Sequence, residues 1–173
     1  MKRRVLLAIV IGLLLIWILP QLAEWIRVTY LTIQHGTELT KAAIQFEITT
    51  NTLSGSRERY YNEERPKFDI VAAGPALSGR LGYWDSVWQD DLVNHPDLYL
   101  VADQRLTNIR VVEYDSTHAS MLARIQWHYR LVNRETMLTN QESDAAAERT
   151  YTFVFEGNTW KVLDFESAGP VKR

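Results

Sequence analysis

The residues most often used for metal binding are widely spaced in this sequence. None of the four histidines has a second ligand at i+2 or i+4, so a metal site is not predicted; they are His35, His95, His118 and His128. The chain has no cysteine. A disulfide framework, a thiol nucleophile and a thiolate metal site are therefore excluded.

Other reactive residues also lack the frames that catalysis needs. Ser78 and Ser86 do not lie in a Gly-x-Ser-x-Gly motif, which positions the nucleophile of many hydrolases. The stretch Gly74–Gly79 lacks the lysine and the glycine spacing of a phosphate loop. Asp90 and Asp91 lie at the end of a predicted helix and are expected to face water. We therefore predict no cofactor and no catalytic residue from motifs alone.

Length and charge bound the organisation of the chain. With 173 residues there is room for one domain of common size and an appendage. Lys2, Arg3 and Arg4 account for three of the 19 basic residues, which leaves 16 against 21 acidic residues. An acidic balance of this kind does not suit a protein that binds nucleic acid.

Residues 5–23 predict a membrane-spanning helix. The run contains no charged residue, and nineteen residues at about 1.5 Å each reach roughly 28 Å, close to the thickness of the hydrocarbon layer. The basic residues 1–4 should stay in the cytoplasm, and Trp17 and Trp25 suit the headgroup region at the far end. We expect a single-pass protein of the cell membrane whose C-terminal domain is extracytoplasmic.

A cleaved signal peptide is the alternative interpretation, because it shares the basic start and the apolar middle. Ala23 can stand at a cleavage site, but Gln21 occupies a position where a small residue is required. The anchor is therefore favoured over the cleaved signal. Lipid anchoring is excluded because the chain has no cysteine.

Residues 24–57 predict a membrane-proximal linker that is either helical or extended. The stretch 25–33 is rich in β-branched and aromatic residues, yet it can also continue the membrane helix. His35 and Gly36 resemble a helix end, with Thr37 as the N-cap of a new helix. Further on, Ile44, Phe46 and Ile48 also fit a short strand, whereas one helix face would contain Leu39, Ala42, Ala43, Phe46 and Leu53.

Two further helical segments are predicted before the strands. Ser54–Ser56 interrupts the pattern, and residues 57–65 form a charged helical turn or a loop that Pro66 ends. Gly74 and Pro75 open the next helix, which extends to about Leu92. Its apolar stripe consists of Leu77, Leu81, Trp84 and Trp88. Two glycines within it, Gly79 and Gly82, allow the alternative that the helix begins after Gly82.

The rest of the chain predicts an antiparallel sheet. The clearest strand, 118–132, alternates between an apolar face and a polar face, and the other strands are predicted at 98–102, 108–114, 150–156 and 159–165. Gly157 and Asn158 predict a hairpin with a primed turn. Residues 133–148 are either a long hairpin loop or frayed strand ends, and residues 169–173 are expected to be a flexible tail.

Helices followed by an antiparallel meander define an α+β domain, predicted for residues 58–168. The order of anchor, short helices, a helix opened by Gly74–Leu77 and a closing hairpin with Trp160 resembles the cystatin-like cone fold of the nuclear-transport-factor-two-like superfamily. More narrowly, it is similar to the intermembrane-space domain of a chloroplast division protein and to membrane-tethered bacterial domains. The resemblance implies a helix-covered, curved sheet with a pocket.

The resemblance also implies where chemistry would take place. Enzymes of the superfamily hold an acid, a histidine or a tyrosine at the apolar mouth of the cone. The residues of suitable type here are Asp69 and Asp85, together with a possible pocket lining of Tyr60, Tyr61, Tyr83, Trp84, Trp88, Trp127 and Tyr129. The simpler interpretation, which we favour, is that Trp84, Trp88, Trp127, Tyr129, Phe153 and Trp160 are core residues.

We therefore expect a membrane-tethered, non-enzymatic domain that binds a protein or supports an assembly. The alternatives are a small cone-fold isomerase, dehydratase or hydrolase, and a domain that carries a small ligand. Superfamily members often dimerise through the sheet. The polar outer face of 118–132, with Arg124, Gln126, His128 and Arg130, is expected either to be solvated or to contact a partner or a second copy.

Overall fold

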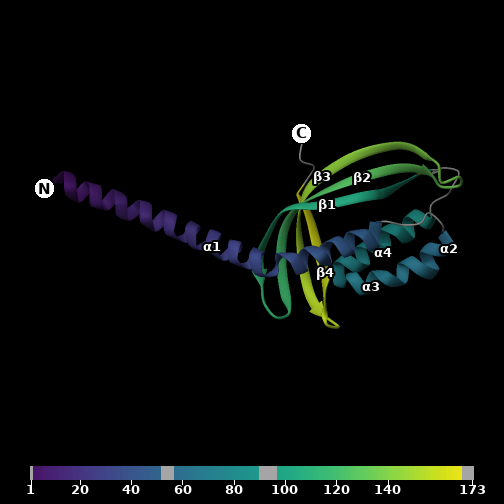
Figure 1. Ribbon diagram of the computed structural model, residues 1–173, viewed down its shortest axis with the longest axis horizontal. Helices are drawn as coiled ribbons and strands as arrows, with labels where there is room; N and C mark the ends of the chain where they lie inside the picture. Colours follow the sequence, from purple (N-terminus) through teal and green to yellow (C-terminus); the bar gives the residue numbers. More distant parts are fainter. Residues whose placement is uncertain (1, 52–56, 90–96, 169–173) are drawn as a thin grey trace.

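A long N-terminal helix leads into a curved antiparallel sheet (Figure 1). In the computed structural model, the described residues are 2–51, 57–89 and 97–168. The helical elements are α1 (Lys2–Asn51), α2 (Arg57–Arg59), the π-helix η1 (Tyr60–Glu64), the 3-10 helix η2 (Arg65–Lys67), α3 (Phe68–Val71) and α4 (Gly74–Gln89). The strands are β1 (Asp97–Tyr114), β2 (His118–Asn133), β3 (Thr139–Glu156) and β4 (Thr159–Ala168). The α+β class predicted from the sequence is confirmed.

The four strands form a meander in the order β1-β2-β3-β4, with every neighbouring pair antiparallel. The strands bend, and the C-terminal part of α1 lies in the concave side together with α3 and α4 (Figure 1). Register shifts in β1, at Val101/Asp103, Thr107/Arg110 and Val111/Glu113, supply the local irregularity that a strongly bent sheet needs. Asn108 has φ 53°, a left-handed conformation that asparagine tolerates well.

The alternation predicted for β2 holds over most of its length. Ala119, Met121, Ala123, Ile125 and Trp127 are buried, and the residues between them are more exposed. Beyond Trp127 the pattern changes, because Val132 is buried where the strict alternation predicted Leu131. The pairing with β3 shifts register between these two residues, which moves the next side chains to the other face.

The ends of the predicted strands need correction. The stretches 98–102 and 108–114 are one continuous strand, β1, because the register shifts absorb the polar residues between them. Strand β3 begins at Thr139, so most of the predicted loop 133–148 is paired with β2. Of the two interpretations given above for this segment, strand ends around an exposed tip is the one observed. Residues Asn133–Leu138 make the turn.

The primed turn predicted at Gly157 and Asn158 is confirmed. Both residues have positive φ, 59° and 66°, as a type I′ turn requires. The turn connects β3 to β4 and places Trp160 opposite Phe155, with ring centroids 5.2 Å apart.

The interruption predicted in α1 at His35 and Gly36 is wrong, since the helix continues to Asn51. Gly36 is buried where the helix crosses β1, and its missing side chain brings the helix close to Ile109. One turn earlier, the Thr32 hydroxyl accepts a hydrogen bond of 2.8 Å from the backbone N–H of Val111. His35 stacks on Tyr114 with ring centroids 3.5 Å apart. Tertiary contacts thus keep a β-prone sequence helical.

The C-terminal half of α1 belongs to the hydrophobic core. Leu39, Ala43 and Phe46 are fully buried and pack with Met121 and Phe153 of the sheet. The core therefore extends beyond the limits of 58–168 predicted for the domain. Of the predicted linker 24–57, residues 24–51 are helical, and the possibility of a strand there is wrong.

The N-terminal half of α1 projects away from the sheet (Figure 1). Between residues 13 and 26 its large apolar side chains are exposed on all sides: Leu13, Leu14, Leu15, Ile16, Trp17, Ile18, Leu19, Leu22, Trp25 and Ile26. Within the described residues, α1 is the one helix that is long and apolar enough to cross a membrane. The predicted limits of the span, 5–23, stay a prediction.

The helix predicted from Gly74 is α4, and it begins at Gly74 rather than after Gly82. Some predicted features lie outside the described residues. They are the break at Ser54–Ser56 with Leu53, the helix end at Asp90–Leu92, His95, and the flexible tail 169–173.

Candidate functional site

The interior of the cone contains a buried ionic network centred on Glu47 of α1. Its carboxylate accepts hydrogen bonds from Arg149 Nη1, from Tyr151 Oη at 3.0 Å and from Asn51 Nδ2 at 2.7 Å. Arg80 of α4 approaches the second carboxylate oxygen at 3.6 Å. Glu47 is completely inaccessible to solvent. An isolated buried carboxylate would be very unfavourable, so these partners are what permits its charge at this position.

The two arginines of the network lie against aromatic rings. The Arg149 guanidinium is 4.8 Å from the Trp127 ring centroid and 4.7 Å from the Phe165 ring centroid. The Arg80 guanidinium also lies 4.8 Å from the Phe165 ring centroid. The negative faces of these rings stabilise the guanidinium groups where water is excluded. Arg149 Nε also donates to Ser167 Oγ at 3.1 Å. The network therefore connects α1, α4, β3 and β4.

Burial changes the protonation equilibria of the groups in this network. Desolvation lowers the pKa of the Arg80 guanidinium, and the Glu47 charge opposes that effect. Desolvation, followed by the Glu47 charge, raises the pKa of the Tyr151 phenol well above its usual range. The Tyr151 phenol thus stays protonated at neutral pH, which suits a structural network more than a proton-transfer site.

A general base must be able to approach its substrate, and Glu47 cannot. Three donors and a second arginine surround the carboxylate, and its atoms have no contact with solvent. Glu47 is not among the residues predicted from the sequence, since a lone glutamate on a helix is usually solvated. Its position in the stripe of Leu39, Ala43 and Phe46 was the available signal, because that stripe is the buried face.

The residues predicted to line a pocket fall into two groups. Tyr60, Trp84 and Trp88 are buried in a second apolar cluster with Phe68 and Leu98, and Tyr61 packs against it. Tyr60 donates to Asp85 at 3.0 Å, and Arg65 donates to both carboxylate oxygens of Asp85. Burial first, and then this hydrogen bond, raises the pKa of Tyr60. Hydrogen bonding to Arg65 lowers the pKa of Asp85.

The other predicted residues lie elsewhere. Trp127 is buried against Arg149, Tyr129 is half-buried beside Trp127, and Tyr83 is exposed on α4. Desolvation raises the pKa of Tyr129. Asp69 is exposed on α3. The structure thus does not bring the predicted set together in one place, and their role as pocket lining stays a prediction.

Of the described histidines, His35 lies on α1, and His118 and His128 lie ten residues apart on β2. His35 is 3.0 Å from Glu38, and His128 is 2.9 Å from Asp144 on the outer face of the sheet. No group of three potential metal ligands occurs among the residues that the structure describes. Hydrogen bonding to Asp144 is the main cause that raises the pKa of His128. Asp144 of β3 thus supplies a negative charge beside the basic outer face of β2.

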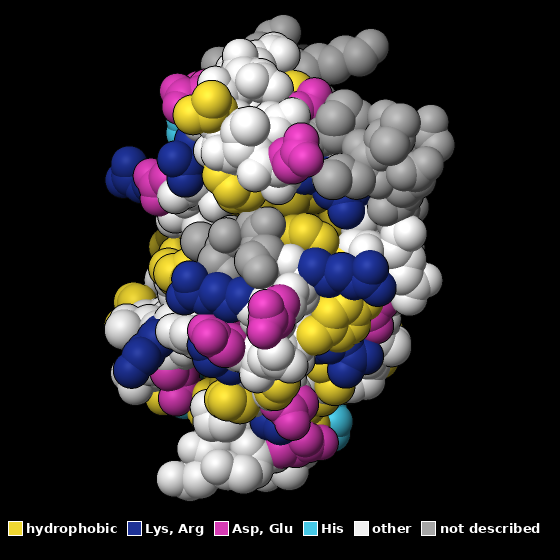
Figure 2. All heavy atoms as spheres, turned by 90° about the vertical axis from the view of Figure 1, so that its right-hand side faces the viewer, with side chains coloured by type: hydrophobic (Ala, Val, Ile, Leu, Met, Phe, Trp, Pro, Cys, Tyr) yellow, Lys and Arg dark blue, Asp and Glu magenta, His cyan; other side chains and the backbone are white. Residues whose placement is uncertain are grey.

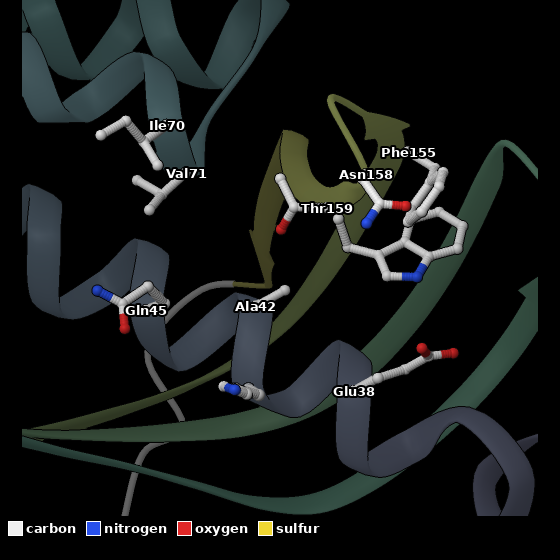
Figure 3. Close-up of a pocket in the computed structure, with 10 residues that line it drawn as sticks. Glu38, Ala42, Gln45, Ile70, Val71, Phe155, Asn158 and Thr159 are labelled. Carbon is white, nitrogen blue, oxygen red and sulfur yellow. The ribbon is translucent and has the colours of Figure 1, made fainter.

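An open groove lies between α1, α3 and the β3–β4 hairpin (Figure 3). It has a volume of about 310 Å³. Its floor includes the buried Trp160, while Ile70 and Phe155 are exposed at its sides. The polar groups around it come from Glu38, Lys41, Gln45, Asn158 and Thr159. Apolar side chains with a polar rim are the composition of a protein-binding surface, and the lining contains no pair of residues arranged for catalysis.

The end of the molecule farthest from the N-terminus has a different character. Figure 2 shows basic and acidic side chains interspersed around small apolar areas on this face. A surface of mixed sign does not concentrate charge as a nucleic-acid interface does.

Comparison with known proteins identifies the fold. No protein-family model and no curated protein matches the sequence. Among solved structures, an IcmL-like type IV secretion system protein from Legionella pneumophila superposes with a TM-score of 0.54 at 16% identity, over 79% of this chain and 94% of that one. The chain has the cystatin-like α+β fold, as the resemblance implied.

Two other solved structures are more distant. The intermembrane space region of the chloroplast protein ARC6 matches with a TM-score of 0.46 at 14% identity, over 73% of this chain and 94% of that one. A cystatin-like protein of unknown function from Nostoc punctiforme matches with a TM-score of 0.35 at 11% identity, over 76% of this chain and 88% of that one. At these identities the likeness concerns the fold, and function must be argued from the chain's own residues.

Proposed function

We propose that this chain is a membrane-tethered, non-enzymatic domain that binds another protein outside the cytoplasm. The observation that carries the proposal is the continuity of α1. Its residues 13–26 expose apolar side chains on all sides, and one face of its C-terminal half is buried in the core of the domain. A helix that is apolar all round requires cover, and a bilayer supplies it.

The orientation follows from charge. Residues 1–4 include three basic residues, which favours a cytoplasmic N-terminus and a domain on the opposite side. Because α1 has no break, the domain is held close to the membrane surface. Arg27 already lies beside Glu113 of β1, and Thr32 accepts a hydrogen bond from the Val111 N–H, so only a short length of helix separates the exposed apolar segment from the domain. A tether of this length confines the domain to a thin layer, which strengthens weak protein binding.

The cone itself supports binding over catalysis. In the family's enzymes an acid faces an open apolar mouth, whereas the buried acid of this chain is engaged by Arg149, Tyr151 and Asn51. The secretion-system protein of the same fold belongs to an assembly by its name, and a role in an assembly would agree with the tether and the groove. We assign the partner contact to the groove around Trp160, about 20 Å along α1 beyond Trp25.

The test uses the full chain in native membranes. A photo-reactive amino acid at Phe155 or Ile70 samples the groove, and the same amino acid at Leu138 serves as the control because Leu138 is also an exposed apolar residue, at the far β2–β3 turn. We expect one discrete product with another protein from the groove positions and none from Leu138. Equal labelling at all three positions would contradict the proposal, as would release of the chain from membranes at alkaline pH.

A further inference from the structure

The free edge of β4 meets the groove at Trp160. Strand β4 ends the sheet, so one of its sides has no neighbouring strand. Ala72, directly after α3, covers that side at Val162 through a parallel bridge, and the Ala73 N–H donates to the Val162 carbonyl at 2.9 Å. Two residues earlier, at Trp160, the groove lies between β4 and Ile70 of α3. An unpaired strand edge is a template for another extended chain.

The main-chain groups of Trp160 point toward this free edge. Trp160 lies opposite Phe155 of β3. The Phe155 N–H donates to the Thr117 carbonyl at 2.8 Å, on the side of β3 away from β4. In an antiparallel pair, two opposite residues either exchange both hydrogen bonds or both point away from each other. The N–H and C=O of Trp160 therefore point away from β3, as the Val162 carbonyl does two residues later.

These two groups have no partner within the part of the chain that the structure describes. Neither the N–H nor the C=O of Trp160 forms a hydrogen bond with residues 2–51, 57–89 or 97–168. Trp160 is only 9% exposed, and main-chain groups with so little access to water normally have a partner. A ligand that supplies one acceptor and one donor would satisfy both groups.

Apolar side chains surround the two groups. Ile70 and Phe155 are 60% and 39% exposed, and the Trp160 ring contributes to the floor of the groove. Figure 3 shows Ile70 of α3 and Phe155 of the β3–β4 hairpin on opposite sides of this space. Glu38 and Lys41 of α1 supply one charge of each sign at the rim. The groove therefore suits an uncharged, apolar side chain.

We propose that the groove binds an extended segment of the partner protein, which pairs with Trp160 as an added strand beside β4. Every second residue of such a segment directs one N–H and one C=O toward β4, and these match the two free groups of Trp160. Its side chains alternate between two faces, so an apolar side chain enters the groove between Ile70 and Phe155. The inference rests on the proposed function and adds the conformation and chemistry of the bound segment.

A helix in the groove would not satisfy these groups. The main-chain N–H and C=O groups of a helix are bonded within the helix, so a docked helix leaves those of Trp160 unpaired. At the other edge of the sheet, the chain itself supplies such a partner, because the Thr32 hydroxyl of α1 accepts a hydrogen bond from the Val111 N–H of β1. At Trp160 the proposal assigns this role to the partner protein.

Peptides test the pairing without changing the chain. A phage library of short random peptides is selected on the full chain in lipid nanodiscs, and the selected peptides are synthesised with one N-methyl group at each main-chain nitrogen in turn. An added strand donates to the Trp160 carbonyl from one nitrogen and not from the adjacent nitrogens. We expect a loss of affinity of about tenfold, equivalent to about 1.4 kcal/mol, at one nitrogen and little change at its two neighbours.

Amide hydrogen exchange supplies a readout on the chain itself. Binding of a selected peptide should slow the exchange of the Trp160 N–H at least about tenfold, because the peptide then accepts its hydrogen bond. The Phe155 N–H is the internal control, since it already donates to Thr117, and its exchange should change little.

A pair of variants shows whether the selected peptides occupy this groove. Ile70→Asp places a charge in the apolar lining and should weaken peptide binding at least about tenfold. Leu138→Asp, at the exposed β2–β3 turn, should leave binding unchanged. Both side chains are exposed, so the fold should persist in both variants, and circular dichroism checks this.

Four results would overturn the proposal. They are equal losses from N-methylation at every nitrogen, unchanged exchange of the Trp160 N–H in the bound chain, equal effects of the two aspartate variants, and selected peptides that do not compete with the cross-linking at Phe155. In each case a discrete protein product at Phe155 would leave the proposed function standing. A product that contains a second copy of this chain would replace the partner protein, and the absence of any product would refute the proposed function itself.

Discussion

Glu47 shows how one charged residue can determine the character of the whole interior. A cone fold with an accessible acid is suited to proton transfer, but here two arginines and a tyrosine surround the carboxylate. The network contains one more positive than negative charge, because two arginines face one carboxylate. In addition, Arg80 Nε has no hydrogen-bond acceptor among the described residues. The network therefore joins the elements around the core, and it leaves the Glu47 carboxylate inaccessible to a substrate.

Removing the Glu47 charge should strongly destabilise the domain. We predict that Glu47→Gln lowers the free energy of unfolding by about 3 to 5 kcal/mol, because it leaves Arg149 and Arg80 buried without a counter-charge. The measurement is urea unfolding of the full chain in detergent, followed by near-ultraviolet circular dichroism. Glu38→Gln is the matched control: Glu38 is exposed and contacts His35 and Tyr114 at the surface, so the expected change is below about 1 kcal/mol.

Equal effects of the two substitutions would mean that the buried network adds nothing beyond a surface ion pair. A further check is the double variant Glu47→Gln with Arg149→Met. It should lose less stability than the sum of the single variants, because the two residues interact directly.

At the scale of elements, the local sequence predicts the structure correctly where the backbone conformation admits only a few residue types. The β3–β4 hairpin is the clearest example, since two consecutive residues with positive φ favour glycine and asparagine. In α1, by contrast, the local preference near Trp25–Ile33 is ambiguous, and packing against β1 decides for helix. The resulting uninterrupted helix is what connects anchor and core.

The hairpin gives a test with an internal control. Gly157→Ala should destabilise the domain by about 1 kcal/mol, because alanine is strained at φ 59°. Gly79→Ala should act in the opposite direction by up to about 1 kcal/mol, because Gly79 lies inside α4 with no atom near its missing Cβ. The midpoints of urea unfolding of the two variants, compared with that of the unchanged chain, measure the two changes in stability. Similar midpoints would show that the turn conformation is not the constraint at residue 157.

At the scale of the whole molecule, α1 contributes both the proposed membrane anchor and part of the core. A chain reduced to residues 29–173 retains Thr32, Leu39 and Phe46, and we predict that it folds and unfolds cooperatively. A chain that begins at residue 58, the domain limit predicted from sequence, should not fold. It lacks three fully buried apolar residues and the carboxylate that pairs with Arg149.

Cooperative urea unfolding and dispersed amide resonances distinguish the two truncated chains. A folded 58–173 chain would show that the sheet and the short helices form a complete domain, with α1 as a dispensable addition. A disordered 29–173 chain would show instead that the domain needs the segment on the membrane side.

The sequence by itself determined the elements whose chemistry is local. An uncharged run long enough to span a bilayer, the alternation of Ala119 to Trp127, and the turn at Gly157 and Asn158 each depend on neighbouring residues alone. The resemblance in element order also led to the correct fold.

Only the tertiary structure decided how far α1 extends and which of its faces is buried. Thr32 and Glu47 have partners at Val111 and Arg149, 79 and 102 residues away in the chain, and no local pattern encodes such distances. The same contacts assign one side of α1 to the sheet and leave the side with Ile26 and Ile33 exposed. Long-range packing thus divides one apolar helix into a projecting segment and a core element.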